Sequence, residues 1–190
     1  MSTDTPNREA ALELFKEYNK SESLLKHALA VEGVMRYMAR KAGEDEEKWG
    51  VVGLVHDLDY EMYPEQHCTM TRKILEENKW PDEYIRAVLS HGWGLASDVE
   101  PVTLMEKTLF AIDELTGLVV TSALVRPSKS VMDMETRSVK KKWNDKRFAT
   151  GVDRSVIEKG AEMLGVTLDE LITNCIMGMR EVADDIGLGI

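Results

Sequence analysis

Hydrophobic side chains recur every three or four residues along most of the chain, which is the spacing of one face of an α-helix. The clearest case is the segment that begins after Ser21, where one apolar stripe contains Leu24, Val31, Val34 and Met38. Nothing in the sequence has the alternating pattern of a half-buried β-strand. The pattern therefore predicts an all-α protein.

Capping residues, prolines and glycines indicate where these helices begin and end. Asn7 can cap a first helix that runs to Tyr18, and Ser21 opens a long helix that stops at Gly43. No repeat, low-complexity tract or Pro/Gly linker divides the chain, so a single domain of about eight or nine helices is expected over residues 1–190. The further helices are expected near 44–57, 65–79, 82–90, 101–125, 134–143, 153–165 and 167–185.

The composition is that of a soluble globular protein, and 190 residues are enough to close a hydrophobic core. A formal net charge of −10 argues against a nucleic-acid polymer as partner, because such binding needs cations that neutralise phosphates. The apolar runs are too short to span a bilayer, and the N-terminal segment lacks a signal-peptide pattern. Cys68 and Cys175 suggest no disulfide framework. We therefore expect a cytoplasmic protein that binds neither membranes nor long nucleic acids.

Four residues with metal-binding side chains fall on the apolar sides of their predicted segments. They are His27, His56, Asp57 and Asp113. Burying an ionised carboxylate without a partner is costly, so a core built only for packing does not explain this set. Imidazoles and carboxylates brought together from separate helices can instead bind a divalent metal ion.

The two other histidines, His67 and His91, also have helical spacings suited to an inward face. A hydrogen-bonded core residue would explain any single histidine, but the inward Asp113 and the set of six together favour a metal site. This mixture of nitrogen and oxygen ligands suits Mn, Fe, Co, Ni or Zn, with one or two ions per chain. Asp57 has two oxygens and is the natural bridge between two ions. Cys68 is not expected to bind metal, because adjacent helical residues point about 100° apart.

The ordered set H…HD…D resembles the HD-domain superfamily of metal-dependent phosphohydrolases. The resemblance covers about residues 20–125, which form the predicted metal core. A C-terminal helical extension is expected over 126–190, and the resemblance continues into it. It implies an HD-type helical bundle whose ordered histidines and aspartates bind metal, and His67 and His91 resemble the extra histidines of two-metal members. The small HDIG-type subgroup is the most similar, through the segments KHALAVEGVMR, GLVHDLDYE, WPDEYIRAVLSHG, AIDELTGLV and SVKKKWNDKRFATGVDRSVIEKGAEMLG.

Several positions depart from the patterns of that superfamily. The HDIG motif reads HDLD at 56–59, so its glycine is missing. The GYP element of the cyclic-dinucleotide branch and the HDxxED pattern of alarmone hydrolases are not met. Tyr60 stands where related nucleotidases have a glutamate, so that catalytic residue cannot be transferred to this chain. The candidates for a catalytic role are Asp57, Asp59 and Glu61.

A basic segment follows the predicted metal core. Residues 126–147 contain eight Lys or Arg residues against three Asp or Glu residues. For most of these side chains a solvated basic surface is the simpler interpretation. Arg126 and Lys129 are nearest to the end of the helix that carries Asp113, and they are our candidates for binding the phosphate of a substrate.

These observations favour a metal-dependent phosphohydrolase that acts on a small phosphoester or nucleotide through a metal-activated water. The alternative is a non-catalytic HD module in which the metal site binds a nucleotide or stabilises a sensor or partner domain. The complete ligand set favours catalysis, whereas the missing glutamate keeps the alternative open. A di-iron oxygenase, known among distant relatives of the superfamily, has no feature in its favour. The sequence indicates no particular oligomeric state.

Overall fold

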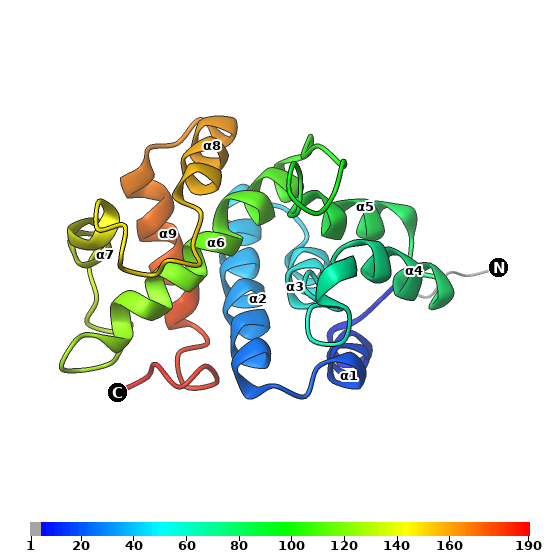
Figure 1. The fold of residues 1–190 in the computed structure, drawn as a ribbon, viewed down its shortest axis with the longest axis horizontal. Coiled ribbons are helices and arrows are strands. Elements are labelled where there is room, and N and C mark those ends of the chain that lie inside the picture. Colours follow the sequence, from blue (N-terminus) through cyan, green and yellow to red (C-terminus); the bar gives the residue numbers. More distant parts are fainter. Residues whose placement is uncertain (1–4) are drawn as a thin grey trace.

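The computed structural model describes residues 5–190, and this part of the chain is built from nine α-helices joined by turns (Figure 1). Within these residues the only β-type pairing is an isolated bridge between Trp93 and Ser97, so the predicted all-α fold is confirmed. The helices are α1 (Arg8–Tyr18), α2 (Glu22–Ala42), α3 (Glu46–Leu54), α4 (Thr69–Glu77), α5 (Asp82–Ser90), α6 (Leu104–Leu124), α7 (Thr136–Trp143), α8 (Arg154–Leu164) and α9 (Leu168–Arg180), with a 3₁₀ turn η1 (Pro64–Gln66) before α4.

Most helix ends lie where the capping residues predict them. The side chains of Asn7 and Ser21 accept hydrogen bonds from the first turns of α1 and α2. Gly43 ends α2 with a φ of 71°, a left-handed conformation that glycine adopts without steric cost. Thr103 and Glu106 form a reciprocal capping box at the start of α6. These ends are set by local hydrogen bonds and could therefore be predicted from sequence.

Two helices near the predicted ligands are shorter than expected. α3 ends at Leu54 instead of continuing to about Asp57, so His56 and Asp57 lie in the turn that follows it. α4 begins at Thr69 instead of residue 65, and Cys68 before it has a φ of 67°. The expectation that the whole ligand set lies on helices is therefore wrong. Irregular backbone instead directs several of these side chains.

The two longest helices, α2 and α6, pack against each other near the middle of the molecule (Figure 1). α1 and α3–α5 lie on one side of them, and α7–α9 lie on the other. One hydrophobic core extends from Ala11 in α1 to Leu188 beyond α9. The predicted C-terminal extension thus shares its core with the helices that precede it. No helix in the described part of the chain is long and apolar enough to cross a membrane.

Glycines allow two close contacts between helices. A Cβ atom added at Gly160 would lie 2.4 Å from the Cβ and 2.5 Å from the Cα of Ala111, so α8 packs directly on the backbone of α6. A Cβ atom at Gly178 would lie 2.6 Å from the Cα of Val34, where α9 packs on α2. Because Asp113 is two residues from Ala111, the contact between α6 and α8 also positions a predicted metal ligand.

Candidate metal centre

The six predicted metal ligands come together although they lie on five separate parts of the chain. His27 lies on α2 and Asp113 lies on α6. Both helices are long and belong to the centre of the fold, so they hold these two side chains firmly. The other four ligands lie in turns, where His56 and Asp57 follow α3, His67 precedes α4 and His91 ends α5.

One group of ligand atoms belongs to His27, His56 and Asp113. The two Nε2 atoms are 3.1 Å apart, and the Oδ1 atom of Asp113 is 3.1 Å from the first and 3.2 Å from the second. Two ligand atoms that each lie about 2.1 Å from one ion are roughly 3.0–3.4 Å apart at octahedral or tetrahedral angles. The Oδ2 atom of Asp57 lies 3.5 and 3.4 Å from the same nitrogens. This spacing fits a single divalent ion.

The second group belongs to His67 and His91, whose Nε2 atoms are 3.0 Å apart. The other oxygen of Asp57, Oδ1, lies 3.6 Å from the first nitrogen and 3.5 Å from the second. Asp57 therefore points one oxygen toward each group. This is the geometry required of a carboxylate that bridges two ions, and the two-ion site stays a prediction that the spacing accommodates.

Hydrogen bonds on the far side of the rings determine which nitrogen is free in three of the four histidines. The Nδ1 atoms of His56 and His91 lie 2.7 and 2.5 Å from backbone carbonyl oxygens, which can only accept, so both nitrogens donate. The Nδ1 atom of His67 donates in the same way to the carboxylate of Asp59 at 2.7 Å. A proton on Nδ1 leaves the lone pair on Nε2, and this is how most metal-binding histidines are held.

Burial and charge have opposite effects on the pKa values of these groups. Burial lowers the pKa of His56, but the carboxylates of Asp57 and Asp113 outweigh it and raise that pKa well above its ordinary value. Burial raises the pKa of Asp57, but the imidazole of His56 holds it well below its usual range, and the pKa of Asp113 is lowered for the same reason. Burial lowers the pKa of His67 too, but the hydrogen bond that His67 donates to Asp59 outweighs it and raises that pKa to about 10. Ionised carboxylates thus favour a cation among these side chains.

The ligand groups line a cavity of about 420 Å³, while His56 is fully buried beneath it. Most of the remaining wall is apolar or glycine. The ring of Tyr60 meets the ring of His67 edge-on, with centroids 5.2 Å apart. The wall residues outside the ligand set are Leu24, Tyr60, Gly92, Leu95, Ala96, Glu114, Gly117, Gly151, Val152 and Val156.

Glu114 is a residue of this cavity that the sequence analysis missed. Its Oε2 atom accepts a hydrogen bond of 3.0 Å from the backbone N–H of Asp153, which ties the segment 151–156 to α6. Burial, and then the charge of the neighbouring Asp113, raise the pKa of Glu114 to about 7. The sequence feature that could have identified Glu114 is its position directly after the predicted ligand Asp113.

Two of the predicted catalytic residues do not line the cavity. Asp59 is fully buried, and its two oxygens accept hydrogen bonds from His67 and from a backbone N–H of α4. Glu61 accepts hydrogen bonds of 2.8 and 2.9 Å from the backbone N–H groups of Lys20 and Ser21, just before α2. The structure therefore does not support an acid–base role for either carboxylate. Asp59 positions a histidine, and Glu61 holds the start of a helix. Of the three predicted catalytic residues only Asp57 lines the cavity.

Replacing Asp59 with Asn is expected to weaken metal binding at the His67–His91 group by about 10- to 100-fold. A neutral amide offers a single oxygen, whereas both oxygens of Asp59 accept hydrogen bonds. Competition with a chromophoric chelator measures this affinity, and Asp98→Asn, at an exposed position, is the control. Unchanged affinity at both groups would show that Asp59 does not position His67.

Arg126 and Lys129 are not brought to the cavity. Arg126 follows the end of α6 and is thirteen residues from Asp113. That separation corresponds to about 20 Å along a helix. The guanidinium of Arg126 is paired with the carboxylate of Asp133 at 2.9 Å, and Lys129 is exposed in the turn after α6. This is a correction to the sequence analysis, because in this position neither side chain can contact a phosphate held at the metal centre.

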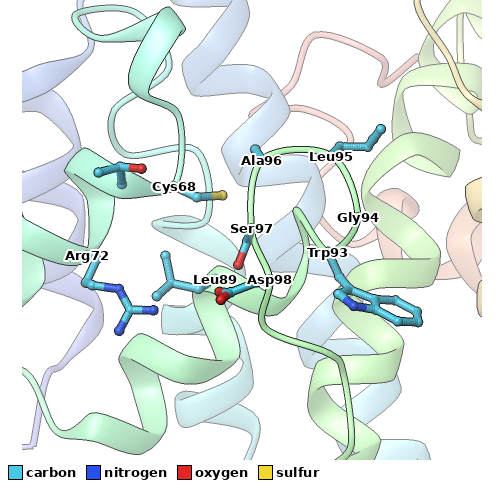
Figure 2. A pocket seen from close by; sticks show the side chains of 10 residues that line it. Cys68, Arg72, Leu89, Trp93, Gly94, Leu95, Ala96, Ser97 and Asp98 are labelled. Atoms are coloured by element: carbon cyan, nitrogen blue, oxygen red, sulfur yellow. The ribbon is translucent and has the colours of Figure 1, made fainter.

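A second and larger cavity, of about 630 Å³, adjoins the first (Figure 2). It lies between the start of α4, with Cys68 and Arg72, and the turn over 93–98, and none of the six predicted ligands lines it. Leu95 and Ala96 line both cavities. The turn after α5 is therefore a shared wall, and the smaller cavity is the one with candidate chemistry.

Cys68 lies closer to the predicted ligands than expected. Its Sγ atom is within 4.8 Å of a ring nitrogen of His67 and of His91. The expectation that its side chain points elsewhere assumed a continuous helix, whereas both Cys68 and His67 precede α4. Figure 2 shows the Cys68 side chain directed into the second cavity.

The comparisons with known proteins agree with this geometry. The model of the HD domain family matches residues 24–118, half of the chain, and this span contains all six predicted ligands. The match does not distinguish the HDIG-type subgroup. Searches of curated proteins and of solved structures gave no significant match. With the all-helical fold and the two converging ligand groups, the match shows that the chain belongs to the HD domain family, whose members are generally metal-dependent hydrolases.

Proposed function

We propose that the protein is a metal-dependent phosphohydrolase that acts on a small phosphoester or nucleotide. The observation that carries this proposal is the position of Asp57, whose two oxygens lie between two groups of imidazole nitrogens at 3.4–3.6 Å. A protein that used its histidines only for packing would not need four Nε2 atoms directed at one carboxylate.

The donor atoms fit divalent transition metals. His27, His56 and Asp113 would hold one ion together with Oδ2 of Asp57. Nitrogen and oxygen donors of this kind suit Mn, Fe, Co, Ni or Zn better than an all-oxygen site for Mg or Ca would. The second ion would be held by His67, His91 and Oδ1 of Asp57.

Divalent ions bound here would supply Lewis acidity, which polarises a phosphoryl oxygen and lowers the pKa of a water molecule. The residues of the chain contribute orientation and exclusion of solvent. Asp59 and the backbone carbonyls hold the histidine rings, and Val152 and Val156 contribute apolar side chains to the cavity wall. Glu114 faces the same cavity, so its carboxylate can accept the proton that water gives up when its oxygen attacks phosphorus.

Metal analysis combined with a phosphatase assay tests this function. Protein purified without chelator is expected to contain at least one transition metal ion per chain. It should release inorganic phosphate from a panel of phosphomonoesters and nucleotides when Mn or Co is present. Chelation should abolish the release, and added metal should restore it. Stoichiometric metal without hydrolysis of any panel member would contradict the proposal and favour a non-catalytic, ligand-binding HD module.

A further inference from the structure

The wall of the metal cavity is nearly devoid of polar groups other than the predicted ligands. Outside the ligand set it is formed by six hydrophobic residues, three glycines and Glu114. In the described part of the chain, no lysine or arginine lines this cavity. The wall therefore offers mainly apolar contacts, with the carboxylate of Glu114 and the hydroxyl of Tyr60 as its polar side-chain groups, to whatever part of a substrate lies beyond the predicted ions.

Cations close to this wall are held in other interactions. Lys159 lies one turn beyond Val156 on α8, and its Nζ atom is over the indole ring of Trp93, 3.6 Å from the ring centroid. Arg154 donates hydrogen bonds to three backbone carbonyl oxygens at the end of α7 and in the turn after it. Neither cation lines the cavity, so a second phosphate group there would meet the carboxylate of Glu114 and no lysine or arginine of the described chain. Burying an anion without a partner is strongly unfavourable.

Two large apolar side chains at this cavity are exposed to solvent. Leu95 is 72% exposed and Tyr60 is 48% exposed. They belong to different turns, one after His91 and one after Asp57, and both line the cavity. A hydrophobic group that entered between them would bury surface that is otherwise in contact with water, which is favourable in proportion to the area covered.

We propose that the substrate is a phosphate monoester with one phosphate and an apolar alkyl or aryl alcohol as its leaving group. The proposal rests on the proposed hydrolase function, which places the phosphate at the predicted ions. In the reaction the water oxygen forms a bond to phosphorus, and the ester P–O bond breaks with its electron pair on the leaving oxygen. That oxygen takes one water proton and leaves as the alcohol, while the other proton stays on inorganic phosphate. Tyr60 and Leu95 contact the apolar group and determine specificity.

Hexyl phosphate and glycerol 3-phosphate provide the test, because both are alkyl monoesters and they differ mainly in the polarity of the leaving group. With Mn-loaded protein, kcat/KM is expected to be at least about tenfold higher for hexyl phosphate. Leu95→Ser should reduce this preference by several fold, and so should Tyr60→Ser. The matched control is Met62→Ser, because Met62 is 54% exposed and does not line the cavity. Equal kcat/KM values for the two esters would overturn the proposal while leaving the hydrolase function intact.

Binding separates this proposal from the hydrolase function. Calorimetric titration of the Mn-loaded protein with hexylphosphonate and with methylphosphonate needs no turnover, because the C–P bond is not hydrolysed. Tighter binding of hexylphosphonate, by about tenfold, with loss of that difference in Leu95→Ser, supports the apolar subsite even if no ester is hydrolysed. Equal affinities for the two phosphonates overturn it, whatever the phosphatase assay shows.

Discussion

Replacing Asp57 with Asn is expected to weaken metal binding at both ligand groups by more than about 100-fold, because the loss of a ligand should exceed the effect of losing a supporting hydrogen bond. The carboxylate faces both pairs of histidine nitrogens, so its neutral isostere removes negative charge from two positions at once. Elemental analysis after dialysis should find almost no transition metal. Phosphatase activity should be lost with the metal.

Single substitutions in each group are the matched controls for this result. Asp113→Asn should weaken only the position formed with His27 and His56, and His91→Ala should weaken only the position formed with His67. If Asp57→Asn keeps one full equivalent of metal, its two oxygens do not serve two ions. If His91→Ala removes all metal, the two groups are not independent.

The second large effect is expected on stability. Gly160→Ala should lower the free energy of unfolding by about 2–3 kcal/mol, because overfilling a packed contact forces the backbone apart. The new Cβ would lie 2.4 and 2.5 Å from the Cβ and Cα of Ala111, and neither atom can move without shifting α6. Equilibrium unfolding in urea measures the change. Because Asp113 lies on the same helix two residues later, metal affinity should fall as well.

Gly117→Ala provides a control with the opposite sign. This glycine also lies within a helix, α6, but an added Cβ would meet only a methyl group of Val152, at an ordinary contact distance of 3.6 Å. The helix propensity of alanine should therefore stabilise the protein by up to about 1 kcal/mol. If both substitutions destabilise the protein equally, the close contact between α6 and α8 at Gly160 is not the cause of the lost stability.

The fold could be predicted largely because its determinants are local. Asn7 and Ser21 begin helices and Gly43 ends one through hydrogen bonds within four or five residues, and apolar periodicity identifies each buried face. The errors arose where tertiary contacts override that periodicity. The apolar pattern continues past Leu54, yet α3 stops there and the next residues turn toward the ligands. The apolar pattern is compatible both with a helix that continues past Leu54 and with a turn there. Contacts with residues distant in the sequence decide between the two backbone conformations.

The candidate site shows the same division. The convergence of the six predicted ligands could be anticipated because buried charged residues need a partner wherever they lie in the chain. The rest of the cavity could not, since it depends on which segments meet in space. Arg126 is near Asp113 along the sequence, but it follows the far end of α6 and does not line the cavity. Val152 is distant along the sequence and forms part of the wall. The sequence shows that Asp59 and Glu61 are acidic, but it does not show which groups they accept hydrogen bonds from, because the folded chain determines those partners.

The hydrogen bond between Glu114 and the backbone of Asp153 has a consequence for how such a protein can diversify. It fastens to the metal cavity a segment, residues 151–156, that lies more than thirty residues beyond the span matched by the HD domain family. Part of the wall of this cavity is therefore encoded outside the stretch that holds the predicted ligands. Mutations in the later stretch can reshape the wall at Val152 and Val156 while every predicted ligand is preserved.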